Sequence, residues 1–207
     1  MGAKKMTETT LDASAALRSP GRVYFRDPGI AAEVLVARAL EDDEWARSAL
    51  YHRFAPEVVN LALRLLRDHD EAGDVLQDTF VSAFETLGAL RDPAKVGAWL
   101  RQICVRHVQR RFRRRRLRRV LGLASPPAIP LAELAARDAS QEARAELARV
   151  DAVLRTLPER ARVVWTLRLV DGETLPNIAA LTGASVATVK RDLALAQAEA
   201  LRVVGGS

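Results

Sequence analysis

Residues 157–201 read LPERARVVWTLRLVDGETLPNIAALTGASVATVKRDLALAQAEAL. Three amphipathic segments lie there, separated by the dipeptides DG at 171–172 and TG at 182–183. Because glycine permits the left-handed backbone of a tight turn between two short helices, the pattern predicts a helix-turn-helix. The second helix of such a motif lies in the major groove of DNA, and here it would begin at Ser185.

The second helix of this motif has a predicted inner face and a predicted DNA face. Ser185 is expected to cap the helix by accepting a hydrogen bond from the amide of residue 187 or 188. Val186, Val189 and Leu193 are expected to face the core. Lys and Arg on the other face can bind guanine edges or phosphate, and Thr can contact phosphate or a thymine methyl. The alternative is a helical hairpin whose polar face is only solvated. The candidate DNA-binding residues are Ser185, Ala187, Thr188, Lys190 and Arg191.

The composition favours a nucleic-acid partner. Of 207 residues 49% are hydrophobic, which suffices for one or two domains with buried cores. The net charge of +6 and the pI of about 10.2 favour a polyanion. The single cysteine, Cys104, excludes an internal disulfide, and no histidine has metal-ligand spacing with it, so we expect no metal and no cofactor. Without a signal sequence or a run of eighteen apolar residues, we expect a cytoplasmic protein with no membrane insertion.

The apolar spacing is helical wherever it is regular, and no segment alternates at period two. The sequence therefore predicts an all-α fold of two small helical domains joined by a flexible linker. Three prolines and almost no charge in 121–132 mark that linker. The expected organisation is a poorly ordered N-terminal extension (1–30), a helical domain (31–119), the linker (120–150) and the helix-turn-helix domain (151–207).

An arginine run continues the last helix of the first domain. Residues 110–119 contain eight arginines in ten positions, interrupted only by Phe112 and Leu117. Charge blocks are often disordered tails. Here the helical pattern continues through the run, so we interpret it as a structured basic face that would bind phosphates in a salt-dependent manner. Upstream, Trp99 at helical spacing is more often a core residue, but it can also stack on an unpaired base.

The segment DEAGDVLQDTFVSAF, residues 70–84, carries an acidic face in this basic protein. Asp74, Gln77 and Asp78 share one exposed helical face, opposite the apolar face that includes Phe80. An acidic face binds DNA poorly, so it suggests a protein partner, although a solvated helix face is the plain alternative. Nothing in the chain supplies a nucleophile or a phosphate-binding loop, and we assign no enzyme site.

Taken together, these segments resemble the extracytoplasmic-function (ECF) sigma factors of bacterial RNA polymerase. LYHRFAPEVVNLALRLLRD, DEAGDVLQDTFVSAFETLGAL and GAWLRQI followed by arginines are similar to sigma region 2. LPERARVVWTLRLVDGETLPNIAALTGASVATVKRDL is similar to sigma region 4. The resemblance covers about residues 34–119 and 146–202.

The resemblance implies partners and roles. Core RNA polymerase would be bound through the clamp helices of its largest subunit and the flap of its second-largest subunit, and an anti-sigma factor is a further implied partner. The recognition helix would read the minus-thirty-five element of promoter DNA. The implied core-binding residues are Asp74, Gln77, Asp78 and Phe80. The residues implied in minus-ten recognition and melting are Trp99, Arg101, Arg106, Arg110, Arg113 and Arg114.

The chain departs from the family pattern at several positions. Arg106 and Arg110 stand where the family often has Asn and Asp, so no minus-ten sequence preference carries over. Asp192, Leu195 and Gln197 replace basic residues common after the recognition helix begins, which predicts weak phosphate contacts there. Two alternatives remain at this stage: a stand-alone helix-turn-helix regulator, which leaves the acidic face unexplained, and a sigma-like protein that binds core without initiating.

Overall fold

The computed structural model describes residues 29–123, 128–130, 133, 141–169 and 171–205. Within these residues it contains helices and no strand, which confirms the predicted all-α class. Most of the predicted N-terminal extension, 1–28, lies outside the described residues.

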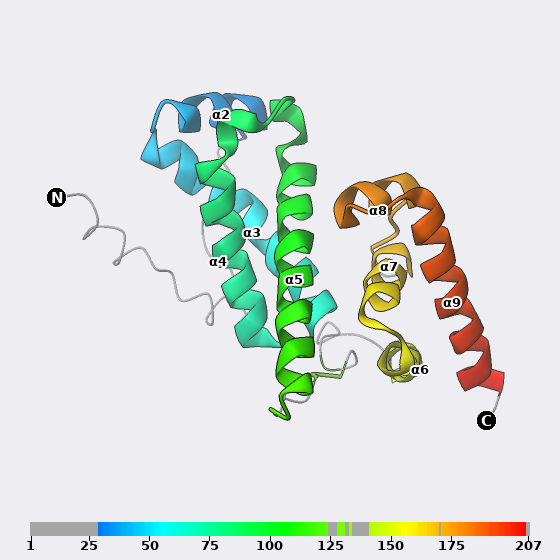
Figure 1. Cartoon of the computed structure of the whole chain (residues 1–207). Helices are drawn as coiled ribbons and strands as arrows, with labels where there is room; N and C mark the ends of the chain where they lie inside the picture. The colour runs from blue at the N-terminus through cyan, green and yellow to red at the C-terminus, as the bar shows by residue number, and fades with distance from the viewer. Residues whose placement is uncertain (1–28, 124–127, 131–132, 134–140, 170, 206–207) are drawn as a thin grey trace.

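The helices before the proline-rich segment form one bundle, which we call the N-terminal group (Figure 1). Asp43 and Asp68 start its two central helices by accepting hydrogen bonds from backbone amides, at 3.1 Å from Ala46 N and 2.9 Å from Glu71 N. The second of these long helices follows directly because Arg67 ends the first in the left-handed conformation, with φ of 57°. The group comprises α2 (Ala32–Leu40), α3 (Glu44–Leu66), α4 (His69–Glu85), the short 3-10 turns η1 (Leu87–Ala89) and η2 (Pro93–Lys95), and α5 (Val96–Val120).

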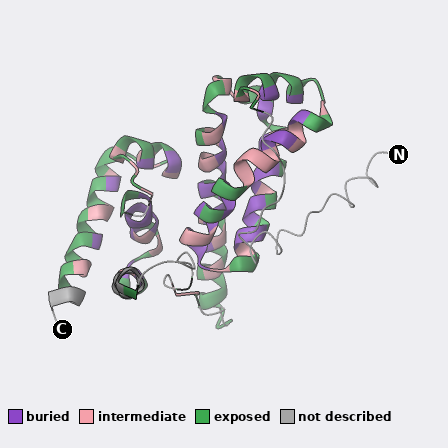
Figure 2. Ribbon diagram, turned by 180° about the vertical axis from the view of Figure 1, so that it is seen from behind, coloured by how far each residue is buried: buried purple, intermediate pink, exposed green. Residues whose placement is uncertain are grey.

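The interior of the N-terminal group is aliphatic. Buried positions recur at helical spacing along α3, α4 and α5, so each helix turns one apolar face inward (Figure 2). Burying one such leucine or valine side chain stabilises the fold by about 1.5–3 kcal/mol. Fully buried members include Leu35, Leu50, Val58, Leu61, Val75 and Leu76.

The remaining helices form the C-terminal group, which contains the predicted helix-turn-helix. Gly183 ends α8 with φ of 67°, as its place between the two helices requires. Ser185 then caps the next helix, because its Oγ accepts a hydrogen bond from the amide of Thr188 at 3.1 Å. The group comprises α6 (Gln141–Thr156), α7 (Glu159–Leu169), α8 (Leu175–Thr182) and α9 (Val186–Gly205). Helix α6 begins within the stretch 120–150 that the sequence assigned to the linker.

The two groups pack against each other. Helix α5 lies beside α8, and α3 contacts α7 (Figure 1). One cluster of buried apolar side chains passes from the N-terminal group into the C-terminal group and takes in Val164, Leu167 and Ile178. A second, smaller cluster around Leu154 and Trp165 belongs to the C-terminal group alone. The chain therefore adopts a closed arrangement of its two helical groups.

Candidate functional site

An arginine stripe runs along the outer face of α5. Arg106, Arg110, Arg113 and Arg114 are all exposed, and their spacing of four, three and one residues places them on one side of the helix. None of the four pairs with an acidic side chain in the described part of the chain. Four uncompensated guanidinium groups on one helical face form a site for a polyanion.

Two other arginines of the same run turn inward. Arg111 bridges Asp74 and Asp78 of α4, at 3.1 and 2.9 Å. Although burial disfavours the charged form, the hydrogen bond that Arg111 donates to Asp78 and the charges of both carboxylates raise the pKa of Arg111. Helical periodicity thus divides the run into an exposed set and a set that pairs with the rest of the N-terminal group, which the sequence analysis did not separate.

Arg115, one turn further along α5, contacts the N-terminal end of α4. Its guanidinium donates to Glu71 at 3.0 Å and to the carbonyl of Leu66 at 3.2 Å. It also lies 3.4 Å from the carboxylate of Asp68, the residue that caps α4. One side chain therefore joins the end of α3, the start of α4 and the arginine helix.

The predicted acidic face of α4 is present at the surface. Asp74 and Gln77 are exposed and Asp78 is half-buried. Phe80 was predicted to belong to the same docking set, but its side chain is 4% exposed. It packs against Tyr51, with the ring centroids 4.7 Å apart, because it lies on the opposite, apolar face of the helix. Phe80 is a core residue, and the acidic face consists of Asp74, Gln77 and Asp78.

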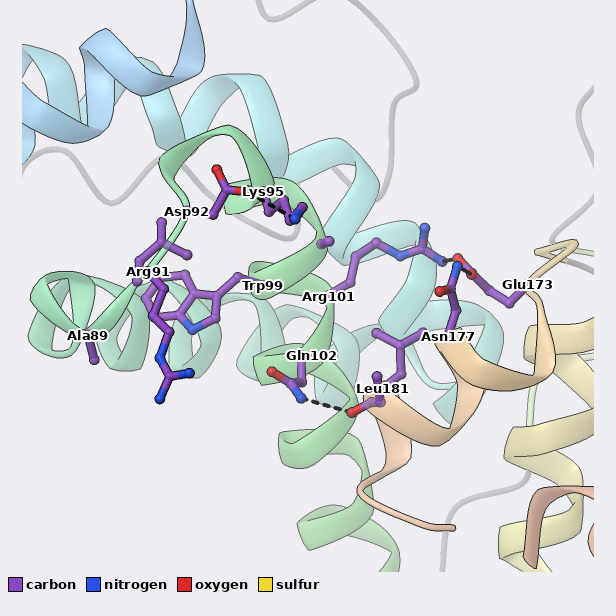
Figure 3. A pocket seen from close by; sticks show the side chains of 13 residues that line it. Ala89, Arg91, Asp92, Lys95, Trp99, Arg101, Gln102, Glu173, Asn177 and Leu181 are labelled. Atoms are coloured by element: carbon purple, nitrogen blue, oxygen red, sulfur yellow. Dashed lines mark hydrogen bonds and ion pairs between the residues drawn. The ribbon is translucent and has the colours of Figure 1, made fainter. Parts of the chain in front are cut away.

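At the start of α5, Trp99 is half-buried beside a cavity of about 580 Å³. Arg91 and Gln102 of the N-terminal group also line this cavity, while Asn177 and Leu181 of α8 form its opposite wall (Figure 3). An aromatic ring, cationic groups and side-chain amides are the groups that bind nucleobases and phosphates. In the closed arrangement, α8 lies across this cavity from Trp99.

Arg101 was predicted to face DNA, but in this arrangement it is engaged in ion pairs. Its guanidinium lies 2.5 Å from Glu173 of the C-terminal group and 3.6 Å from Glu57 of α3 (Figure 3). The stretch between α7 and α8 brings Glu173 to this position. No sequence signal identified Glu173, because its partner is distant along the chain and the contact depends on how the two groups pack.

The predicted recognition helix α9 has an open outer face. Ser185, Ala187, Lys190 and Arg191 are exposed, and Thr188 is half-buried. Val186, expected in the core, is 39% exposed, so that prediction was wrong. As the first residue of α9 it precedes the buried face, which begins at Val189.

Beside these residues, Asp192 pairs with Arg160 of α7 at 2.6 Å. The pair fixes α9 against α7, and it also places a carboxylate within the recognition helix. The basic character of the first two turns of α9 therefore rests on Lys190 and Arg191. Arg202, in the last turn, pairs with Glu199 at 2.9 Å.

Comparison with known proteins agrees with this geometry. The family description "Sigma-70 region 2" matches residues 50–118, and "Sigma-70, region 4" matches residues 147–198. The chain is 30% identical over 179 residues to the RNA polymerase sigma factor CnrH of Cupriavidus metallidurans, covering 84% of this chain and 94% of that protein. It is 29% identical over 172 residues to the ECF RNA polymerase sigma factor SigM of Mycobacterium tuberculosis, covering 83% of each.

Solved structures give the same result for the fold. CnrH in complex with the cytosolic domain of CnrY matches with a TM-score of 0.56 and 26% identity, over 86% of this chain and 99% of that one. The sigma factor RpoE of Bartonella quintana, in complex with the anti-sigma factor NepR, matches with a TM-score of 0.55 and 23% identity, over 73% and 92%.

The class defined by these matches is the RNA polymerase sigma factors. Within it, the chain belongs to the extracytoplasmic-function family, and the resemblance drawn from its motifs is confirmed. The helices that the structure describes include none long and apolar enough to cross a membrane. The same residues contain no group of three or more His, Cys, Asp or Glu placed to hold a metal ion.

Proposed function

We propose that this chain directs core RNA polymerase to promoters through three surfaces. The acidic face of α4 (Asp74, Gln77 and Asp78) docks on the clamp helices of the largest subunit. The start of α5 and its arginine stripe bind and open the minus-ten element, and α9 reads the minus-thirty-five element. The flap of the second-largest subunit holds the C-terminal group. The observation that carries this proposal is that one chain presents an acidic face on α4 and two separate faces with exposed basic residues, on α5 and α9.

Each of these residues has a role that follows from the chemistry of its side chain. Trp99 stacks on an unpaired base, and Arg101 stabilises the strand beside it once it leaves Glu173. The stripe of Arg106, Arg110, Arg113 and Arg114 neutralises phosphates along the opening duplex. On α9, Lys190 and Arg191 bind guanine edges or phosphates, Thr188 and Ala187 contact bases, and Ser185 positions the helix through its cap.

Further properties follow from the same proposal. No residue of the chain acts in catalysis, because the polymerase forms the phosphodiester bonds, and the protein works in the cytoplasm. CnrH was solved in complex with the cytosolic domain of CnrY, and the Bartonella sigma factor was solved in complex with the anti-sigma factor NepR. By analogy, an anti-sigma factor regulates this chain by covering one or both DNA surfaces.

The direct test adds the purified chain to core RNA polymerase and maps transcript starts on genomic DNA. We expect co-purification with core and a set of new, shared promoter sequences. Absence of core binding would refute the sigma assignment of these surfaces. Core binding without specific starts would favour the alternative of a sigma-like protein that does not initiate.

A sharper test concerns the acidic face. Asp78→Arg should weaken core association while binding of the isolated chain to duplex DNA stays unchanged. Glu33→Arg is the matched control, because Glu33 is exposed on α2, away from that face. Arg111→Gln separates the effect of losing the Arg111 bridge from the effect of losing the acidic charge. Equal weakening by Asp78→Arg and Arg111→Gln would show that the face is only structural.

A further inference from the structure

Large apolar side chains gather at the exposed C-terminal end of α5. Their exposed fractions run from 52% at Leu123 to 77% at Val120. Single exposed leucines are common on protein surfaces, but a cluster of them forms a patch that a partner normally covers. This patch, which we call the apolar tip, consists of Leu117, Val120, Leu121 and Leu123.

The backbone holds the apolar tip in a defined shape. Gly122 adopts the left-handed conformation, with φ of 72°. The amides of Gly122 and Leu123 donate to the carbonyls of Arg119 and Arg118, at 3.1 and 2.9 Å. These two bonds form the glycine cap that commonly ends a helix, so the chain turns sharply and Leu123 stays beside the last turn of α5.

Arginines border the apolar tip. Leu117 follows Arg113 by four residues and Arg114 by three, so it continues the face of the arginine stripe. Arg116 and Arg118, on either side of Leu117 in the sequence, are both exposed. Neither of them pairs with an acidic side chain of the described residues. The tip is therefore an apolar surface set among cationic groups.

Little negative charge opposes these arginines. Residues 93–132 contain no Asp or Glu, but they contain eleven Lys and Arg. Among carboxylates of other segments, Glu71 is bound to Arg115, at 3.0 Å. Glu159 lies 3.6 Å from Arg119, on an exposed side chain. The end of α5 therefore attracts anions, and its apolar side chains distinguish it from a surface that binds phosphate alone.

The place of the tip in the fold favours a bilayer surface over a partner protein. Helix α5 projects beyond the neighbouring end of α4, so the tip stands at one extremity of the N-terminal group (Figure 1). A partner helix needs a groove for its apolar face, whereas these side chains stand on a projecting helix end. Leucines set among arginines are the arrangement with which an amphipathic helix enters the headgroup region of an anionic bilayer.

We propose that the apolar tip and the arginines around it bind the surface of a bilayer that contains anionic phospholipids. The leucines enter the boundary between headgroups and acyl chains, and the guanidinium groups pair with lipid phosphates. The contact is peripheral and uses only the end of one helix. It does not rest on the proposed function, since it needs neither core polymerase nor promoter DNA.

The test measures flotation of the full chain with lipid vesicles. One set of vesicles contains equal parts of phosphatidylglycerol and phosphatidylcholine, and the other contains phosphatidylcholine alone. We expect the parent chain to float with the anionic vesicles at low salt and to be released as the salt concentration rises. Absence of binding to the anionic vesicles, or equal binding to both sets, would overturn the proposal.

Leu117→Gln with Leu121→Gln is the decisive variant. It should lower partitioning into anionic vesicles by at least about tenfold, because two leucines no longer leave water. Both sites are exposed, so the fold should be kept, and circular dichroism checks this. Leu40→Gln with Leu201→Gln is the matched control, since it removes two similarly exposed leucines from α2 and α9. An equal loss in the control would overturn the proposal.

Arg116→Gln with Arg118→Gln tests the electrostatic part. Each arginine near an anionic surface increases partitioning about fivefold, so the loss should be about 25-fold. Arg38→Gln with Arg202→Gln lowers the net charge equally at exposed sites on α2 and α9. This control should have a much smaller effect. Equal losses in the two variants would show that net charge alone attracts the chain, which contradicts a site on α5.

A fluorophore that responds to the polarity of its surroundings locates the contact. On Leu123→Cys its emission should move to shorter wavelength with anionic vesicles. On Glu85→Cys, at the far end of α4, it should not change (Figure 1). Both sites are exposed, and the native Cys104 is fully buried and stays unlabelled. A shift at Glu85→Cys without one at Leu123→Cys would overturn the assignment to the apolar tip.

The alternative partner of the tip is DNA, because the arginine stripe continues into it. Affinity of the leucine variant for duplex DNA is measured by fluorescence anisotropy without vesicles. We expect the value of the parent chain, since phosphate binding needs the guanidinium groups and not the leucines. Loss of duplex affinity with unchanged vesicle binding would assign the tip to DNA and overturn the lipid proposal.

Discussion

The two proposed DNA surfaces, on α5 and α9, differ in how much positive charge they offer. On α5, four exposed arginines follow one another along one face, without an acidic partner in the described residues. On α9, Lys190 and Arg191 are exposed, and the next residue, Asp192, is a carboxylate paired with Arg160. We therefore expect electrostatic affinity for the phosphate backbone to reside mainly in the N-terminal group.

The difference has a physical consequence for promoter binding. Phosphate contacts supply affinity without sequence information, while base contacts supply sequence selection. We therefore expect this chain to gain most of its DNA affinity from α5 and to use α9 to position the duplex. Packing of the two groups adds to the contrast, since it pairs Arg101 with Glu173 but leaves Lys190 and Arg191 of α9 exposed.

The largest effect should come from the arginine stripe. Replacing Arg106, Arg110, Arg113 and Arg114 by glutamine should lower the slope of log affinity against log salt by about 0.9 for each arginine that contacts a duplex phosphate. The loss of duplex affinity at low salt should exceed that of any other set of substitutions on α5 or α9. Anisotropy titrations over a series of salt concentrations measure both quantities. A slope equal to that of the parent chain would show that the stripe does not contact DNA.

A smaller loss is expected from the recognition helix. Lys190→Gln with Arg191→Gln should reduce the same slope by at most about 1.8, two contacts at the same value per phosphate. The variant should also lose discrimination between promoter and random duplex, because guanine readout by these side chains is removed. If this pair lowered duplex affinity more than the four α5 substitutions, the order of the two surfaces would be reversed.

Adjacent arginines of one run should differ in their effect on stability. Arg115→Gln should lower the free energy of unfolding by about 1–2 kcal/mol, because it leaves Glu71, Asp68 and the carbonyl of Leu66 without their partner. Arg114→Gln removes the same charge from an exposed site, and should change stability by less than about 0.5 kcal/mol. Urea unfolding followed by circular dichroism measures both. Equal values would mean that the inward contacts do not stabilise the α4–α5 packing.

The sequence predicted local features well because they depend on neighbouring residues. The turn at Gly183 and the cap at Ser185 follow from residues a few positions apart, and both appear as expected. For Phe80, the helical spacing and the family resemblance led to different predictions. Its helical spacing placed it on the apolar face, and only the resemblance assigned it to the docking set, where its burial excludes it.

Features that depend on packing between distant segments were not predictable in the same way. Arg111 and Arg115 have the same sequence surroundings as Arg113 and Arg114, and only their angle around α5 relative to α4 separates them. Glu173 and Asp151 meet their arginine partners because the two groups close on each other. The apolar periodicity of the sequence carries no information about such a contact, so the closed arrangement was not predicted.

The smallest expected effect is on pH dependence, and it should belong to the N-terminal group because all three histidines lie there. Burial lowers the pKa of His107 below its ordinary value of 6.5; Arg110 and Arg111 act in the same direction, and Asp78 opposes them. As the pH falls, His107 therefore takes up a proton at a higher pH in the unfolded chain than in the folded chain. Stability is fully present above about pH 6.5 and falls as the pH drops through the window between the ordinary and the lowered pKa.

Urea unfolding at pH 7.5 and at about pH 5.5 tests this sign, since only histidine among ordinary side chains titrates in that interval. His107→Gln should show a smaller loss of stability between the two pH values than the parent chain does. His69→Gln is the matched control, because His69 is exposed at the start of α4 and should leave the loss unchanged. A loss that is identical in His107→Gln and the parent chain would assign the acid sensitivity to other groups. It would also remove the pH contrast between the N-terminal and C-terminal groups.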